Sequence, residues 1–299
     1  MSKILITGVT GFTGRYLAPK LAGAGYEVHG TVHGEAGPDV PGLSKLHSLD
    51  IGDADAISRL VSAIAPEKVV HLAAISFVAH SDIAAMYRTN ILGTRNLLDA
   101  LTNIASPPSA VLLASSANIY GNAREGMLDE RVPPAPANDY GVTKATGELV
   151  TSLYRDRLPL IVVRPFNYTG RGQSEQFVIP KIVSHVRRRE PEIELGNLHV
   201  ARDFSDVRGV ADAYARLIET PAAIGGLFNI CSGHAVSLHE ILGLVQQISG
   251  HALQVRVNPA FVRAGEVKSL CGSAARLKSV IGPLAMPPLD QTLRWMLEA

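Results

Sequence analysis

Tyr140 and Lys144 stand four residues apart in the stretch NDYGVTKATGE, residues 138–148. At this spacing two side chains lie on one face of a helix, so a phenol and an ammonium group become neighbours. A phenol has an ordinary pKa near ~10 and must shift down by about 3 units to exchange protons near neutral pH. A nearby ammonium group supplies part of such a shift. The pair therefore suggests an acid–base tyrosine tuned by a lysine, provided that the rest of the chain builds a site around it.

A glycine-rich segment at the start of the chain supplies the context for this pair. Residues 3–7 form an apolar strand-like run that leads into GVTGFTG, with Gly8, Gly11 and Gly14. A strand that runs into glycines and then a helix is typical of dinucleotide binding, because the backbone approaches the pyrophosphate and the helix N-terminus faces it. Lys144 would then hold the nicotinamide ribose, and an oxidised nicotinamide would lower the tyrosine pKa further. Three more residues of the turn are predicted to contact the cofactor: Phe12, Thr13 and Arg15.

The second strand bears on the choice between NAD and NADP. An acidic residue at its end would bind the ribose 2′-hydroxyl of NAD, but Val32 and His33 stand there. Arg15 could instead meet a 2′-phosphate, so the cofactor is NADP or NAD, and the sequence favours NADP. Asp50, with Ile51 beside it, follows the third strand and is expected to bind the adenine amino group; an ordinary helix-start aspartate is the alternative.

The fold class follows from alternating patterns in the first half of the chain. Short apolar runs begin near residues 3, 27, 46, 68 and 110, and segments with helical spacing separate them. Such alternation predicts an α/β fold, a Rossmann-type doubly wound parallel sheet, with a smaller C-terminal α/β substrate domain. We expect the first domain to span 1–165 and the second mainly 166–299, with the amphipathic helix 205–220 folding back onto the first.

Composition excludes several classes of protein. The 299 residues carry a net charge of +1, which gives no electrostatic case for nucleic acid or a membrane surface. Two cysteines and ten histidines show no ligand spacing, so no metal site is expected. The chain shows no signal peptide and no apolar stretch of membrane-spanning length, and we expect a cytoplasmic protein.

A second donor for the reacting oxygen is expected at the end of the strand in LLASSANIYG, residues 112–121, where Ser115 and Ser116 are the candidates. Ligands bind at this carboxyl edge in doubly wound sheets. Together with HLAA at 71–74, the segment around Asn90 and the Tyr140–Lys144 pair, this segment resembles the extended short-chain dehydrogenase/reductases that act on nucleotide sugars. RPFNYTGRGQ (164–173), GNLHVARDFSDV (196–207) and RAGEVKSLCGS (263–273) are most similar to the GDP-mannose branch.

The resemblance implies roles for individual residues. Tyr140 would be the acid–base group, Lys144 the ribose-binding partner and Ser116 the residue bonded to the reacting sugar oxygen. The cofactor positions that it adds are Leu72, Ala73, Ala74 and Asn90. The substrate positions are Asn118, Asn167, Arg202, Arg263 and Glu266, with the arginines suited to a diphosphate because their planar fork grips phosphate at two points. For Arg202 and Arg263 a surface salt bridge is the alternative.

The reaction depends on Asn118. The dehydratases of this branch have a glutamate two residues before the tyrosine of YG, where it removes the C5 proton; here Asn118 stands in that place, and an amide cannot take a proton from carbon. The expected activity is reduction of the C4 ketone of a GDP-6-deoxy-4-keto-hexose, giving GDP-rhamnose or GDP-6-deoxy-talose. A nucleotide-sugar 4-epimerase with tightly bound NAD, a GDP-mannose 4,6-dehydratase and a non-catalytic dinucleotide sensor are the alternatives.

The expected helices over 82–104 and 139–157 resemble those with which members of this family form the four-helix bundle of a homodimer, so a homodimer is expected.

Overall fold

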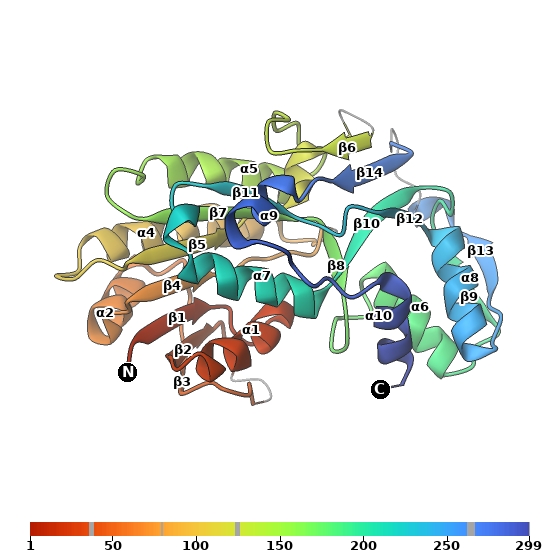
Figure 1. Cartoon of the computed structure of the whole chain (residues 1–299), viewed down its shortest axis with the longest axis horizontal. Helices are drawn as coiled ribbons and strands as arrows, with labels where there is room; N and C mark the ends of the chain where they lie inside the picture. The colour runs from red at the N-terminus through yellow and green to blue at the C-terminus, as the bar shows by residue number, and fades with distance from the viewer. Residues whose placement is uncertain (36–38, 79, 123–125, 262–266, 299) are drawn as a thin grey trace.

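The computed structural model describes residues 1–35, 39–78, 80–122, 126–261 and 267–298. Its centre is a seven-stranded parallel sheet with the order β3-β2-β1-β4-β5-β7-β11 (Figure 1). The chain builds outward from β1 in one direction and then from β4 in the other, so the strand order reverses between these two strands and opens a crevice at their carboxyl ends. The strands are β1 (Lys3–Thr7), β2 (Glu27–Val32), β3 (Lys45–Ser48), β4 (Lys68–His71), β5 (Ala110–Ala114), β7 (Leu160–Pro165) and β11 (Leu227–Ile230).

Helices cover both faces of this sheet, as the expected Rossmann-type architecture requires. Along β1, Ile4 and Ile6 belong to one buried cluster and Leu5 to another, because successive side chains of a strand point to opposite faces. The first face packs against α1 and α7, and the second against α2, α4 and α5, which lie on the other side of the sheet in Figure 1. These helices are α1 (Phe12–Gly23), α2 (Ala54–Ile64), α4 (Thr94–Thr102), α5 (Asp139–Ser152) and α7 (Val207–Glu219).

The single helix expected over 82–104 is instead three segments. An α-helical turn, α3 (Ile83–Tyr87), leads into a π-helical segment, η1 (Arg88–Gly93), before α4 begins. Gly93 allows the close approach of this helix to the edge of the sheet, since a Cβ there would lie 2.5 Å from Ile51 Cγ2. A π-helical segment within a helix shifts the side chains that follow and often marks a functional region.

The remaining elements form a second layer beside the sheet. A five-stranded sheet with the order β12-β10-β14-β6, in which β8 also pairs with β10, packs with α6, α8 and α10 around its own apolar cluster. Its elements are β6 (Gly126–Leu128), β8 (Asn167–Thr169), β10 (Ala201–Asp206), β12 (Ala235–Ser237), β14 (Ser269–Gly272), α6 (Val178–Arg187), α8 (Leu238–Ser249) and α10 (Leu289–Leu297). Smaller elements are the ribbon of β9 (Glu192–Leu195) and β13 (Gln254–Val257), helix α9 (Ala275–Ile281) and the 3-10 turns η2 (Ala117–Tyr120), η3 (Pro221–Ala223) and η4 (Pro259–Phe261).

The two layers exchange segments across the boundary expected near residue 165. Helix α7 packs on the first sheet against α1, and β11 follows it as the seventh strand of that sheet. In the other direction, β6 leaves the first half of the chain and pairs with β14. Among the described residues no helix has both the length and the apolar character to cross a bilayer, and no cluster of three or more His, Cys, Asp or Glu side chains could hold a metal.

Candidate active site

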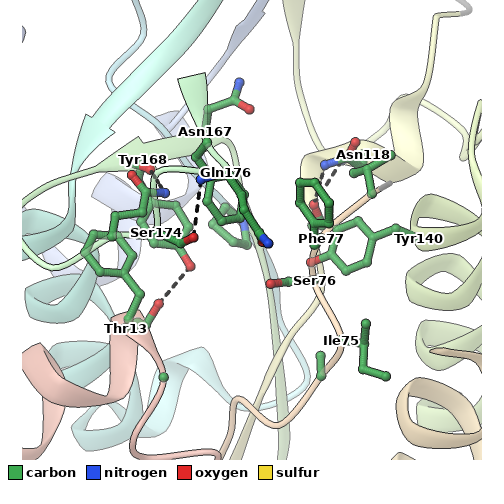
Figure 2. A pocket seen from close by; sticks show the side chains of 18 of the residues that line it. Thr13, Ile75, Ser76, Phe77, Asn118, Tyr140, Asn167, Tyr168, Ser174 and Gln176 are labelled. Atoms are coloured by element: carbon green, nitrogen blue, oxygen red, sulfur yellow. Dashed lines mark hydrogen bonds between the residues drawn. The ribbon is translucent and has the colours of Figure 1, made fainter. Parts of the chain in front are cut away.

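A cleft of ≈ 1730 Å³ lies at the carboxyl ends of β1, β4 and β5 and extends toward the second layer. In Figure 2, Ile75, Ser76, Phe77, Asn118 and Tyr140 form one side of it, and Thr13, Asn167, Tyr168, Ser174 and Gln176 form the other. Most of the residues predicted from the sequence line this one cleft. They are Gly8, Gly11, Phe12, Thr13, Gly14, Arg15, Asp50, Ile51, Leu72, Ala73, Ala74, Ser116, Asn118, Tyr140, Lys144, Asn167 and Arg202.

The glycine loop fits a dinucleotide by its backbone geometry. Gly8 has φ +68°, and a Cβ on it would lie 2.9 Å from the Cα of Ala73. At Gly14 a Cβ would lie 2.3 Å from the carbonyl oxygen of Val9, so no larger residue fits the start of α1. Gly11 precedes α1 without a side-chain cap, and the first turn of the helix carries no acidic residue. The N–H groups of Gly8, Val9 and Gly11 bond within the protein, so the first turn of α1 is the part of this segment whose backbone N–H groups could bind a pyrophosphate.

The groups expected around the adenosine end lie at the outer part of the same cleft. Arg15 donates from Nε to the carbonyl oxygen of Thr10 at 2.9 Å, and His33 is exposed just beyond β2. Asp50 does not cap a helix, because Asp53 caps α2 by accepting from the N–H of Ala56. Asp50 instead accepts from the N–H of Gly52 at 2.8 Å in a tight turn, which leaves its second carboxylate oxygen available to a ligand.

The Tyr140–Lys144 pair begins helix α5. Asn138 caps this helix by accepting from the N–H of Gly141 at 2.8 Å, which fixes the first turn that carries Tyr140. Tyr140 is buried, and the Lys144 Nζ lies 5.8 Å from the centre of its ring. The same Nζ donates to the carbonyl oxygen of Ala114 at the end of β5, at 2.8 Å. The helix and the sheet edge together hold the two groups side by side, as their spacing predicted.

The expectation that the lysine lowers the tyrosine pKa does not hold for the protein groups alone. Burial raises the pKa of Tyr140 well above 10, Tyr168 raises it further, and only a hydrogen bond with Ser116 acts in the opposite direction. Burial likewise lowers the pKa of Lys144 to about 8, although Glu148 acts against this. Desolvation is the largest influence on both pKa values because the two groups are packed out of water, where each resists ionisation. In this state Tyr140 is a firmly protonated phenol.

Ser116 lies two residues beyond β5 and caps η2 beside the tyrosine. Its Oγ accepts from the backbone N–H and from the side-chain Nδ2 of Asn118, both at 3.1 Å. With its lone pairs engaged in this way, the hydroxyl has its one hydrogen left to donate: to the Tyr140 oxygen in this structure, or to a substrate oxygen that takes its place. The neighbouring Ser115 is buried, and its Oγ has no hydrogen-bond partner. Of the two serines, Ser116 is the one that contacts the tyrosine, and Asn118 is the residue that orients it.

Two of the predicted substrate residues, Asn167 and Arg202, line the cleft. Asn167 begins β8 and donates to the carbonyl oxygen of Asp203 at 3.3 Å, while its side chain is exposed to the cleft. Arg202 on β10 also lines the cleft and donates from Nη1 to the carbonyl oxygens of Ala201 and Val267. The predictions for Arg263 and Glu266 lie outside the described residues.

Asn90, predicted to contact the cofactor, has a different position. It is buried in the π-helical segment η1 and does not line the cleft. Its side chain accepts from the N–H of Ile75 at 2.8 Å and donates to the carbonyl oxygen of Ile75 and to Thr143, both at 3.0 Å. With its side-chain amide engaged in this way, Asn90 fastens the loop after β4 to helix α5.

Several cleft residues were not predicted from the sequence. The Tyr168 hydroxyl hydrogen-bonds with Thr13 Oγ1 at 2.7 Å, across 155 residues of sequence, and its ring stacks on Phe12. Phe77, Ser76 and Gln176 also line the cleft. Of these residues, Phe77 could have been predicted to line the cleft, because it follows β4 by only six residues and ligands bind at the carboxyl edge of the sheet.

Two residues outside the cleft, Arg171 and Gly209, lie against the C-terminal segment. Arg171 does not line the cleft; it donates to the carbonyl oxygen of Trp295 at 2.6 Å and stacks over that ring. Gly209 lies against the segment before α10, and a Cβ there would be 2.5 Å from Met286 Sδ. Both residues therefore serve the attachment of the C-terminal segment.

Two proteins that act on GDP-6-deoxy sugars, according to their names, are similar to this chain over nearly its whole length. A GDP-6-deoxy-D-talose 4-dehydrogenase of Aggregatibacter actinomycetemcomitans is 33% identical over 281 residues, covering 94% of this chain and 91% of that protein. A GDP-6-deoxy-D-mannose reductase of Pseudomonas aeruginosa is 32% identical, covering 99% and 96%.

Solved structures are similar over nearly the whole chain. A proposed epimerase from Burkholderia cenocepacia J2315 is 50% identical with a TM-score of 0.94, covering 99% of this chain and 97% of that one. The structure of RMD from Pseudomonas aeruginosa complexed with NADPH is 30% identical with a TM-score of 0.85, covering 100% and 98%. The profile of the family described as GDP-mannose 4,6 dehydratase matches residues 5–294. With its Rossmann-type sheet and its tyrosine, lysine and serine at one cleft, the chain belongs to this family.

Proposed function

We propose that the protein reduces the C4 ketone of a GDP-6-deoxy-4-keto-hexose with NAD(P)H. The observation that carries this proposal is the cluster of Ser116, Asn118, Tyr140 and Lys144 at the end of β5, in which an amide occupies the place of the dehydratase glutamate. Relatives named as a GDP-6-deoxy-talose dehydrogenase and a GDP-6-deoxy-mannose reductase support the substrate class.

The chemistry assigned to the protein groups follows from their states. The nicotinamide cofactor, when bound, supplies the hydride. Burial holds Tyr140 protonated. As the carbonyl oxygen becomes an alkoxide, a stronger base than a phenolate, Tyr140 donates its proton to that oxygen. The hydroxyl of Ser116 donates to the same oxygen and stabilises that charge. Lys144, still mostly charged near neutral pH with a pKa of about 8, holds the ribose and keeps a positive charge near the phenolate that forms.

NADPH is the cofactor that we propose in preference to NADH. Support comes from Arg15 at the outer edge of the cleft, from the absence of an acidic residue at Val32 and His33, and from the relative solved with NADPH. Other similar structures contain NAD, so the test uses both cofactors.

The experiment supplies the purified protein with GDP-4-keto-6-deoxy-mannose and either NADH or NADPH, follows nicotinamide oxidation and identifies the product by NMR. One cofactor should be oxidised for each new C4 hydroxyl, giving GDP-rhamnose or GDP-6-deoxy-talose. Tyr140→Phe should lower kcat by about 1,000-fold or more while leaving NADPH binding nearly unchanged, because only the proton donor is removed. Failure of the wild type to oxidise either cofactor would reject the assignment.

A nucleotide-sugar 4-epimerase is the second candidate, because the 50% identical structure is described as a proposed epimerase. An epimerase would purify with bound NAD and interconvert C4 epimers without net consumption of NADH or NADPH. The stoichiometry measured in the same experiment separates the two reactions. Dehydration is disfavoured by Asn118, whose amide cannot accept the C5 proton.

The oligomeric state is also a proposal. Leu149 on α5 is 70% exposed, Leu153 directly after that helix is 69% exposed, and Leu92 in the adjoining η1 is 52% exposed. Large apolar side chains gathered on neighbouring helices are typical of an interface, and a homodimer would cover them.

The two cysteines, Cys231 and Cys271, are buried and unpaired, which is compatible with the reducing cytoplasm.

A further inference from the structure

Two phenylalanines from different parts of the chain meet at the cleft. Phe77 lies in the loop between β4 and α3, and Phe177 is the residue that precedes α6 in the second layer. Their ring centroids are 6.2 Å apart at an interplanar angle of 79°, an edge-to-face contact. Both line the cleft and are only partly buried, so part of each ring remains open to a ligand. Figure 2 shows Phe77 on the same side of the cleft as Tyr140 and Asn118.

The position of this pair relates it to one part of the proposed substrate. The reacting C4 must lie beside the Tyr140 hydroxyl, and C6 is only two bonds away from C4. Two sets of polar groups near this corner are already engaged: Ile75 N–H and C=O bond to Asn90, and the Asn118 amide bonds to Ser116. The Ser76 hydroxyl also lines the cleft, and the ring edge of Phe77 is the apolar surface that this corner offers to the C6 substituent.

We propose that Phe77, held in place by Phe177, forms the subsite for the C6 methyl group and selects 6-deoxy sugars over 6-hydroxy sugars. A methyl group gains contact with the rings, whereas a hydroxyl group placed there would lose its hydrogen bonds to water without gaining a partner. An apolar pocket rejects an added hydroxyl by up to about 100-fold. This inference rests on the proposed function and specifies which sugars the same site accepts.

The test compares two GDP-hexoses that differ only at C6, GDP-6-deoxy-mannose and GDP-mannose, or the corresponding talose pair if the wild type uses that C4 configuration. Oxidation with NADP⁺ gives the ratio of kcat/KM for the two sugars. Calorimetric titration of the Tyr140→Phe protein with NADP⁺ present gives the ratio of their Kd values without turnover. We expect the wild type to favour the 6-deoxy sugar by about 10- to 100-fold in kcat/KM.

Three substitutions of Phe77 separate polarity from shape. Phe77→Leu keeps the subsite apolar and should leave the ratio within about 3-fold of the wild type. Phe77→Tyr keeps the ring and adds a hydroxyl partner, and Phe77→Ser opens the corner to water; both should lower the ratio by about 5-fold or more, mainly by improving use of the 6-hydroxy sugar. Thermal unfolding and NADPH binding serve as controls for folding.

Two results would overturn the inference. One is a wild-type ratio close to 1 in both measurements, which would indicate that a polar group such as the Ser76 hydroxyl serves C6. The other is an equal loss of selectivity in Phe77→Leu and Phe77→Ser, which would assign the effect to shape. If the wild type oxidises neither sugar, the proposed function fails, and the Kd ratio still decides whether this corner prefers a methyl group.

Discussion

His71, the last residue of β4, is predicted to make the protein sensitive to acid. Its imidazole is buried, with Nδ1 2.7 Å from Thr7 Oγ1 and Nε2 2.9 Å from Thr94 Oγ1. The hydroxyl of Thr94 donates its one hydrogen to the carbonyl oxygen of Asn90 at 2.7 Å, so it must accept from His71. The ring is therefore a neutral Nε2–H tautomer that accepts from Thr7 at Nδ1. This series of hydrogen bonds joins β1, the strand before the glycine loop, to the π-helical segment η1.

The size of the effect follows from the pKa. Burial, and then the charge of Lys144, lower the pKa of His71 from 6.5 to about 3. Because the folded state resists a proton that the unfolded state accepts, stability from this residue is complete above pH 6.5 and falls as the pH drops toward 3. Each pH unit in that window costs about 1.4 kcal/mol. At about pH 5 the loss attributable to His71 is roughly 2 kcal/mol.

The assay is denaturant unfolding of the wild type and of His71→Gln at about pH 7.5 and pH 5. Gln cannot titrate, so the variant, although less stable at the higher pH, should lose roughly 2 kcal/mol less than the wild type on acidification. His234→Gln, at an exposed histidine, is the matched control and should keep the wild-type response. The reasoning is wrong if His71→Gln shows the wild-type pH dependence, or if imidazole NMR finds an Nδ1–H tautomer or titration near pH 6.5.

Three further predictions concern the cofactor loop, the lysine and the dimer. Gly14→Ala should abolish NADPH binding or destabilise the protein by about 3 kcal/mol, because its Cβ would collide with the backbone of Val9; unchanged binding in a fluorescence titration would contradict this. NADPH affinity should fall as the pH rises through about 8, where the Lys144 ammonium loses its proton, and Lys144→Met should remove that step; an identical pH profile for the variant argues against the role. Leu149→Glu combined with Leu153→Glu should convert a dimer to monomers in light scattering, and an unaltered mass excludes this interface.

Much of the sheet and the site could be predicted because the signals are local. The apolar runs at residues 3–7 and 27–32 match β1 and β2 residue for residue, since strand formation depends on the pattern of adjacent side chains. The spacing of Tyr140 and Lys144 within one helix made them neighbours whatever the tertiary context. The carboxyl-edge rule for doubly wound sheets then brought Ser116 to the same place as the glycine loop.

Features that depend on distant contacts could not be predicted in this way. The break of the 82–104 segment into a π-helical turn, and the use of Asn90 as a fastening group, depend on how that helix packs against Ile75 and α5. The contact of Tyr168 with Thr13 joins residues 155 apart, and β11 completes the first sheet from far along the chain. For the protein groups alone the pKa of Tyr140 is raised, because burial, which the sequence does not show, is the largest influence on it.

The sequence by itself thus determined the class of fold, the glycine loop after the first strand and the placement of Tyr140 beside Lys144, because each rests on residues within a few positions of one another. The tertiary structure decided which of the predicted residues face the cleft, how protonated they are, and that Phe77 and Phe177 meet across it. The reason is that hydration, and so every pKa and every apolar contact in the site, depends on what the distant parts of the chain exclude from water.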